Sequence, residues 1–532
     1  MRRLSILALA AAAALAQHQH PKANEKPPAL LPGLGNHHFP IATASPEAQK
    51  FFDQGLTLLY GFNRYEALRS FRRAAELDPK ALMPRWGMAM ALGPHINMDL
   101  DGDVNQKEAC EILRAANAVS LGAPERERAY AETAASRCLE SDPHKYQQAL
   151  RGLASRYPDD LDAATLLAES LMIPARWRWW TPEGQPAEGM EEAIRALEGV
   201  LRRNPEHPGA NHFYIHAVEM SPTPERAVLS AQRLMGIVPA AGHLVHMPGH
   251  IWLLLGEFEL AAATNERAAE VDRQYFAATG VTSGYAGYYV HNLHFVAYAR
   301  QMQGRREDAT RAAETVVREA RPFTAEMPMM VDAFLPYLLF VQARFARWDD
   351  ILAAQPPDAK LHASAALHHF GRALALNAKG RREEAAAGQR AFEAARKKLP
   401  ADWMWLNNKA ADILAIAAEV LAARLAASPD AALAHWQRAV ELQDRLVYEE
   451  PPAWYYPIRE SLGGALLGSG RAAEAEAVFR EGLRRGPRNG RMLFGLRESL
   501  KAQGKQEAAA AVGREFEKAW SRADVELKLA EL

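Results

Sequence analysis

Three segments of the sequence concentrate histidines at spacings that bring side chains together on one helix face. They read NHFYIHAVE over residues 211–219, HLVHMPGH over residues 243–250 and HNLH over residues 291–294. Side chains three or four residues apart lie on the same side of a helix, so each segment can offer two imidazoles to one ion. The candidate ligands are seven histidines: His212, His216, His243, His246, His250, His291 and His294. Because imidazole nitrogens suit Zn, Cu(II) and Fe, the sequence predicts a transition-metal site.

Two further side chains extend this pattern and are candidates for a catalytic role. Glu219 follows His216 by three residues, and Tyr298 follows His294 by four. A carboxylate beside a metal-activated water can act as a base, whereas a histidine-rich site with nearby tyrosines suits oxygen or peroxide chemistry at Cu or Fe. Seven histidines and one carboxylate exceed the needs of one ion. They leave room for two metals, or for one metal with supporting histidines.

The elements that must position these residues are helical hairpins repeated along the chain. A 34-residue repeat has small residues where two helices approach, a glycine between them, an aromatic residue on the second helix and a proline after it. Two frames, starting at residues 48 and 456, match nearly everywhere. They contain Gly55, Ala67, Phe71, Ala74 and Pro79, and Gly463, Gly470, Ala475, Phe479, Gly482 and Pro487. These are features of the tetratricopeptide repeat (TPR), so we predict an all-α, TPR-type solenoid of helical hairpins, a superhelix with a concave groove.

Weaker frames in the middle of the chain place the histidines at matched positions. Frames starting at residues 208, 242 and 290 put His212, His246 and His294 at position 5. Position 9 holds His216, His250 and Tyr298, and position 2 holds His243 and His291. These positions share one face of the first helix, which we expect to line the groove. A metal-free polar network binding an anionic or peptide ligand, and plain structural packing, remain as alternatives.

We predict five segments along the chain. Residues 1–16 have two arginines, an apolar stretch and an Ala-Leu-Ala end, as in a cleavable signal peptide. Residues 17–45 form an extended N-terminal strap. Residues 46–205 hold TPR-like repeats with an inserted tryptophan-rich loop, residues 206–320 the central histidine-rich repeats, and residues 321–532 the C-terminal repeats. The loop contains Trp177, Trp179 and Trp180 before a Pro/Gly turn, so it cannot be a regular helix, and we expect it either to fill space in the core or to cap the groove.

Charge and composition restrict the compartment and the partners. The net charge of -1 provides no basic surface for nucleic acid. With the signal peptide cleaved, we expect a periplasmic or secreted protein with no stable membrane span. The two cysteines, Cys110 and Cys138, could pair across a hairpin in an oxidising compartment or pack separately in the core.

The chain resembles a group of exported bacterial TPR proteins, mostly of unassigned function. The resemblance covers nearly the whole mature chain and rests on the histidine blocks at 209–219, 243–251 and 291–295, and on the blocks at 86–97 and 450–457. It implies the TPR fold and export, and it implies no reaction.

Together these features predict an exported TPR metalloprotein that binds one or two Cu, Fe or Zn ions through groove-facing histidines. It could be a redox or hydrolytic enzyme. HExxH, P-loop, dinucleotide-binding and Gly-x-Ser-x-Gly motifs are absent from the sequence, so those classes lack support. The alternative is a non-enzymatic scaffold that binds a peptide or protein partner in its groove.

Overall fold

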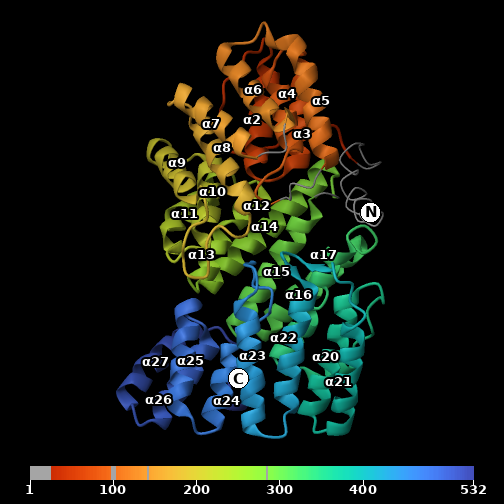
Figure 1. The fold of residues 1–532 in the computed structure, drawn as a ribbon, viewed down its shortest axis with the longest axis vertical. Helices are drawn as coiled ribbons and strands as arrows, with labels where there is room; N and C mark the ends of the chain where they lie inside the picture. Colours follow the sequence, from red (N-terminus) through yellow and green to blue (C-terminus); the bar gives the residue numbers. More distant parts are fainter. Residues whose placement is uncertain (1–24, 98–102, 140–142, 283–284) are drawn as a thin grey trace. The chain divides into compact units, whose positions relative to one another are not determined.

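The computed structural model describes residues 25–97, 103–139, 143–282 and 285–532, and almost all regular structure in them is helical. One short antiparallel pair, β1 (Met404–Trp405) and β2 (Asn408–Lys409), is the exception among the named elements. Consecutive helices pair as antiparallel hairpins of the TPR type (Figure 1). The predicted all-α, helical-hairpin fold class is confirmed.

The chain forms two compact units, Met1–Ile251 with Thr264–Tyr289, and Trp252–Ala263 with Val290–Leu532. The first unit holds α2 (Pro46–Tyr60), α3 (Arg64–Leu77), α4 (Met83–Leu92), α5 (Asp103–Ser120), α6 (Glu125–Leu139), α7 (Pro143–Arg156), α8 (Leu161–Met172), η2 (Ile173–Ala175), α9 (Met190–Arg203), α10 (Pro208–Glu219), η3 (Pro224–Ala227), α11 (Val228–Ile237) and α12 (Gly242–His246). Three helices contribute residues to both units: α13 (Pro248–Leu254), α14 (Phe258–Thr279) and α15 (Ala286–Met302).

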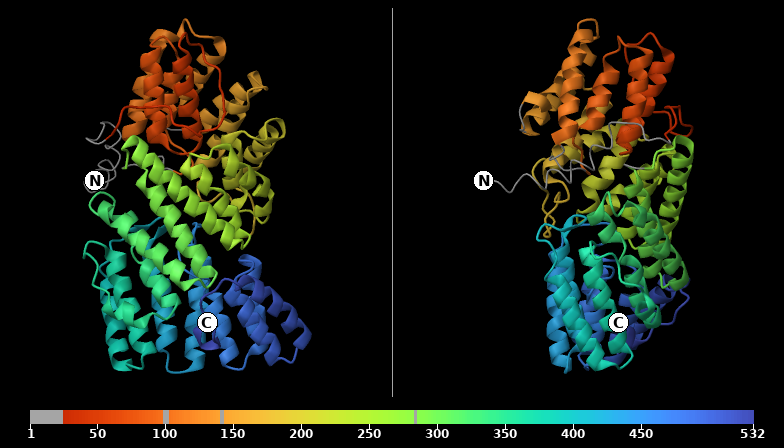
Figure 2. Two further views of the ribbon diagram at one scale, coloured as in Figure 1. Left: turned by 180° about the vertical axis from the view of Figure 1, so that it is seen from behind. Right: turned by 90° about the vertical axis from the view of Figure 1, so that its right-hand side faces the viewer.

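The second unit continues with further hairpins, which are coloured from green to blue in Figure 2. Its elements are α16 (Arg306–Ala320), η4 (Arg321–Phe323), α17 (Pro328–Phe334), α18 (Tyr337–Arg344), α19 (Trp348–Ala353), α20 (His362–Ala378), α21 (Arg382–Arg396), α22 (Ala410–Leu425), α23 (Pro429–Asp444), α24 (Arg459–Gly468), α25 (Ala472–Arg485), α26 (Gly490–Ala502), α27 (Gln506–Ala519) and η5 (Leu529–Glu531).

Small residues allow the paired helices to touch at the positions that the repeat pattern predicts. A Cβ added to Gly55 on α2 would lie 2.6 Å from the ring of Phe71 on α3, so only glycine fits there. Gly463 on α24 meets Phe479 on α25 in the same way, at 2.5 Å. Both phenylalanines are fully buried, so the contact that joins each hairpin also forms its core.

The turn between paired helices contains a residue with left-handed backbone conformation, and in most repeats this residue is glycine. Five glycines in the turns between paired helices have positive φ: Gly256, Gly304, Gly380, Gly470 and Gly504. The frame starting at residue 48 has Phe62 at this position, with a φ of 55°. A side chain in this conformation costs about 1–2 kcal/mol relative to ordinary backbone. Phe62 is 2% exposed, so the strained turn holds a buried ring.

Residues 25–45, the described part of the predicted strap, form no helix or strand and run along the first unit. Its backbone is tied to helices far along the chain. The Lys26 N–H donates to the Thr279 carbonyl at 2.8 Å, and the Gly33 carbonyl accepts from the Ala240 N–H at 3.0 Å. The predicted signal peptide and the first residues of the strap lie outside the described residues.

Cys110 on α5 and Cys138 on α6 form a disulfide. Of the two possibilities that the sequence left open, the structure has the paired one.

No helix in the described part of the chain has both the length and the apolar character needed to cross a membrane.

Candidate metal centre

Three helices of the first unit bring five histidines and one carboxylate into its interior. His212, His216 and Glu219 lie on α10, where Pro208 occupies the first turn and the His207 side chain accepts from the Ala210 N–H at the N-terminus. The next hairpin adds three histidines: His243, His246 and His250. All six side chains are at most 3% exposed. The sequence predicted histidines on a groove wall, whereas these imidazoles are buried because neighbouring helices and loops cover them.

The second histidine segment is not one continuous helix. α12 ends at His246, and α13 begins at Pro248. Proline cannot donate to the backbone ladder, so the helix is interrupted between the two. His246 and His250 still point toward each other across this break, with their Nε2 atoms 2.7 Å apart.

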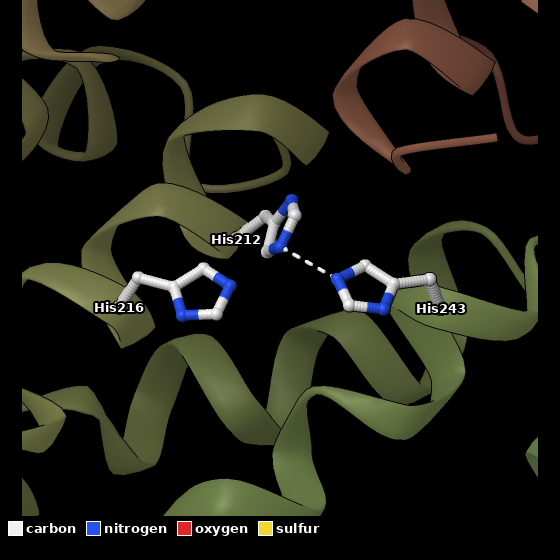
Figure 3. Close-up of side chains that lie close together, drawn as sticks. All are labelled: His212, His216 and His243. Atoms are coloured by element: carbon white, nitrogen blue, oxygen red, sulfur yellow. Dashed lines mark hydrogen bonds between the residues drawn. The ribbon is translucent and has the colours of Figure 1, made fainter. Parts of the chain in front are cut away.

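The imidazoles of His212, His216 and His243 converge. One ring nitrogen from each lies within 4.8 Å of the others. The Nε2 atoms of His212 and His243 are 3.2 Å apart, and Figure 3 shows the three rings turned toward a common space. Two nitrogens about 2.0–2.1 Å from one tetrahedral ion are separated by about 3.3 Å. The His212–His243 distance is that of a hydrogen bond and is also close to the separation of two ligands of one metal.

Neighbouring groups fix the rings of four histidines by their Nδ1 atoms. His212 Nδ1 lies 2.5 Å from the Tyr60 carbonyl oxygen, which can only accept. His212 therefore carries its proton on Nδ1, and its Nε2 lone pair is free for a ligand. His216 Nδ1 lies 2.9 Å from a Glu219 carboxylate oxygen, with the same consequence. The Nε2 atom of His216 is buried without a hydrogen-bond partner among the described residues.

The same arrangement holds for the other two histidines. His250 Nδ1 lies 2.7 Å from the second oxygen of Glu219, and His246 Nδ1 lies 2.6 Å from Oδ1 of Asn265 on α14. A histidine that ligates a metal ordinarily donates its other N–H to such an acceptor, which fixes the ring and its tautomer. Four of the five imidazoles therefore have an acceptor at Nδ1.

Burial lowers the pKa of three imidazoles of the site, and neighbouring histidines lower the pKa of Glu219. Burial lowers the pKa of His212 and His243 well below the usual value, and neighbouring imidazoles lower it further. Burial also lowers the pKa of His216, although Glu219 opposes this. Burial alone would raise the pKa of Glu219, but His216 and His250 outweigh it and lower that pKa. Neutral imidazoles around one buried anion form a set that a cation stabilises.

Aromatic rings enclose the imidazoles. The Phe62 ring lies 4.5 Å from His212 and 5.1 Å from His243, measured between ring centres. Tyr288 lies 4.8 Å from His243, and Trp179 lies 5.9 Å from His216. Trp179 is fully buried and its Nε1 donates to the Met172 carbonyl at 2.8 Å, so this residue of the irregular tryptophan loop fills the core beside the site.

Three residues that the sequence placed in the site belong to the second unit: His291, His294 and Tyr298, all on α15. The His294 ring packs against Tyr337 and Phe334, at 4.1 and 5.5 Å between centres. Burial lowers the pKa of His294 to about 3. Tyr298 is 4% exposed, and burial followed by the charge of Glu460 raises its pKa. A role for these three residues in metal binding stays a prediction.

A second group in the first unit, His37, Asp162 and His207, has its ligand atoms equally close together. Its hydrogen bonds differ from those of a metal site. His207 Nδ1 accepts from the Ala210 N–H, so the proton of the neutral ring is on Nε2, which faces Asp162. Asp162 also accepts from the Tyr60 hydroxyl at 2.6 Å and pairs with His37 at 2.9 Å. We interpret this group as an ion-pair network that joins the strap to α8.

Sequence reasoning missed the groups that orient the ligands. The Tyr60 carbonyl is 152 residues from His212, and a backbone oxygen has no signature in the sequence. Asn265 lies on the second helix of its repeat, away from the histidine segments. Phe62 had a usable signal, because it replaces the glycine that other frames have at position 15.

No family model and no curated protein matches this chain. Among solved structures, a human IFIT1 dimer with m7Gppp-AAAA aligns over 90% of this chain and 91% of its own, with 13% identity and a TM-score of 0.35. Yeast Tom70 aligns over 88% of this chain and 90% of its own, with 10% identity and a TM-score of 0.30. Both likenesses are too low to transfer a ligand or a partner.

Proposed function

We propose that this chain is a metalloprotein that holds a transition-metal ion with His212, His216 and His243. The observation behind the proposal is the orientation of the rings. His212 and His216 each give their Nδ1 proton to a fixed acceptor, which leaves an Nε2 lone pair directed at the space between the rings. A buried lone pair without a partner costs free energy that a metal ion would recover.

The ligand set restricts the metal. Neutral imidazoles suit Zn, Cu(II) and Fe, and the set contains no thiolate, because both cysteines are in the disulfide. Three protein ligands leave an open position, as in metal sites that bind water or substrate. We propose a hydrolytic reaction if the ion is Zn and a redox reaction if it is Cu or Fe. The metal would supply Lewis acidity in the first case and electron transfer in the second.

The sequence suggested Glu219 as a catalytic base. We propose a different role for it. Both of its oxygens accept imidazole N–H groups, from His216 at 2.9 Å and from His250 at 2.7 Å. A carboxylate held in this way orients the ligands and raises their basicity. We therefore assign Glu219 as a positioning residue.

Metal analysis of the chain purified from its native compartment tests the proposal. We expect at least one Cu, Fe or Zn ion per chain by inductively coupled plasma mass spectrometry. The ion should be lost in His212→Ala and His216→Ala, and it should remain in His369→Ala, a matched change on α20 of the second unit. A folded wild-type chain that binds no metal would overturn the proposal, and the scaffold that binds a peptide or protein partner would take its place.

We also propose that the protein is exported to the periplasm or secreted, as the resemblance to exported TPR proteins implies. The Cys110–Cys138 disulfide supports this, because such bonds persist in oxidising compartments. Cell fractionation tests the proposal. Recovery in the periplasm or the medium, without residues 1–16, supports export, and recovery of the full-length chain in the cytoplasm contradicts it.

A further inference from the structure

His246 and His250 face each other beside the first three ligands. Their Nε2 atoms are 2.7 Å apart, and both rings are buried. The facing nitrogens belong to rings whose Nδ1 atoms already meet acceptors, Oδ1 of Asn265 for His246 and Glu219 for His250. Each Nδ1 therefore carries the proton of its neutral ring, and two Nε2 lone pairs point toward each other. A cation between the two nitrogens would accept both lone pairs.

We propose that His246 and His250 hold a second metal ion, adjacent to the first, so that the centre is dinuclear. This inference rests on the proposed function at His212, His216 and His243. Two nitrogens that each lie about 2.0–2.1 Å from one ion are about 2.7–2.9 Å apart when the N–metal–N angle is about 80–90°. The observed separation is in this range.

Glu219 links the two positions. One of its oxygens accepts from His216, a ligand of the first ion, and the other accepts from His250, a ligand of the second. The two ligand groups also adjoin elsewhere, since the His243 and His246 rings on α12 are 5.4 Å apart between centres. One buried carboxylate therefore orients a ligand of each ion, and its negative charge offsets part of the positive charge of both. This arrangement suits paired metals that act on one small substrate.

The number of ions per chain tests this inference. The full chain is stripped with a chelator, incubated with Zn²⁺, separated from free ion and analysed for zinc. We expect two ions in the wild type and in the His369→Ala control. We expect one ion in His250→Ala, in which the first three ligands remain.

A second variant keeps the test decisive where His250→Ala does not fold. Asn265→Leu leaves every ligand in place and removes the acceptor at His246 Nδ1. We expect the second ion to bind about 10–100-fold more weakly in this variant, while the affinity for the first ion is unchanged. Circular dichroism checks that the helices are intact.

The possible outcomes separate this inference from the proposed function. No bound zinc in the folded wild type would overturn both. One ion that is lost in His212→Ala but kept in His250→Ala would overturn the dinuclear centre alone. The His246–His250 contact would then be a hydrogen bond, with the Asn265 amide reversed. Two ions, one of them dependent on His250 and Asn265, would support the dinuclear centre.

Discussion

At the scale of single residues, the candidate centre depends on which nitrogen of each imidazole carries the proton. The sequence could predict the histidines themselves, because helical spacing places His212 and His216 on one face. It could not predict the acceptors, since the Tyr60 carbonyl comes from another hairpin and the Asn265 amide from the second helix of its repeat. Ligands follow a local pattern, whereas the groups that orient them depend on tertiary packing.

Replacing Glu219 by glutamine tests the orienting role. A glutamine has one acceptor oxygen, so one of the two imidazole N–H groups would face an amide N–H instead. We expect metal affinity to fall about 10–100-fold, measured by competition with a chelator. The control is Glu198→Gln. Glu198 lies outside the site and accepts hydrogen bonds from Tyr214 and Arg226. Unchanged affinity in Glu219→Gln would exclude the positioning role.

Replacing Phe62 by glycine separates backbone strain from ring packing. Glycine relieves the left-handed turn by about 1–2 kcal/mol, but the loss of a buried phenyl ring costs about 3–5 kcal/mol. We expect a net loss of stability, and faster release of metal to a chelator because the ring no longer covers His212 and His243. Urea unfolding measures the stability, and the rate of metal transfer to a chelator measures the release.

The matched control for Phe62→Gly is Ala346→Gly in the second unit. Ala346 has a φ of 54° and little side chain to lose. This control should gain up to about 1 kcal/mol and release metal at the wild-type rate. Equal release rates in both variants and the wild type would show that the Phe62 ring does not shield the site.

At the scale of elements, the repeat pattern predicted the hairpins more reliably than their details. Gly55, Gly463 and their partner phenylalanines meet as the pattern requires. The break between His246 and Pro248 departs from the continuous first helix on which the positional argument relied. The break changes little in the ligand geometry because both histidines remain one turn apart. The attachment of the strap depends on long-range contacts that a non-periodic sequence does not encode.

The pairing of His37 with Asp162 predicts a pH-dependent attachment of the strap. Burial lowers the pKa of His37, but the charge and hydrogen bond of Asp162, aided by Asp53, outweigh it and raise that pKa above 6.5. A group whose pKa is raised on folding stabilises the protein at pH below the unfolded pKa. This contribution is lost as the pH rises through the folded pKa.

A comparison of His37→Gln with the wild type measures this contribution, with chelator present so that metal binding does not interfere. The difference in unfolding free energy should be largest at about pH 6 and should shrink toward about pH 8. A difference that stays constant over this range would show that His37 acts through packing rather than charge. The matched control is His38→Gln, whose exposed side chain pairs with Asp53.

At the scale of the whole molecule, the sequence predicted the class of fold but carried no mark of the division into two units. That division falls within α13, α14 and α15, between the frames that start at residues 242 and 290. Contacts between residues distant in sequence decide it, and a repeat pattern records only local spacing. The predicted site residues on α15 therefore belong to the second unit, whereas the histidines on α10, α12 and α13 belong to the first.

The disulfide provides a prediction for the stability of the first unit. Cys110 and Cys138 are 28 residues apart, and a cross-link of this length restricts the unfolded chain by about 3–4 kcal/mol. We expect the double variant Cys110→Ser/Cys138→Ser to lower a calorimetric unfolding transition by several degrees. A reductant should lower the same transition in the wild type and leave the variant unchanged. A wild-type transition that is insensitive to reductant would contradict a stabilising role.

X-ray absorption spectroscopy of the metal-containing chain tests the central claim most directly, because it detects the ligands themselves. We predict a first shell of nitrogen and oxygen at about 2.0–2.1 Å, with the outer-shell scattering of several imidazoles. The imidazole contribution should decrease in His216→Ala. A spectrum without imidazole scattering, or a folded native chain with no metal to measure, would contradict the account.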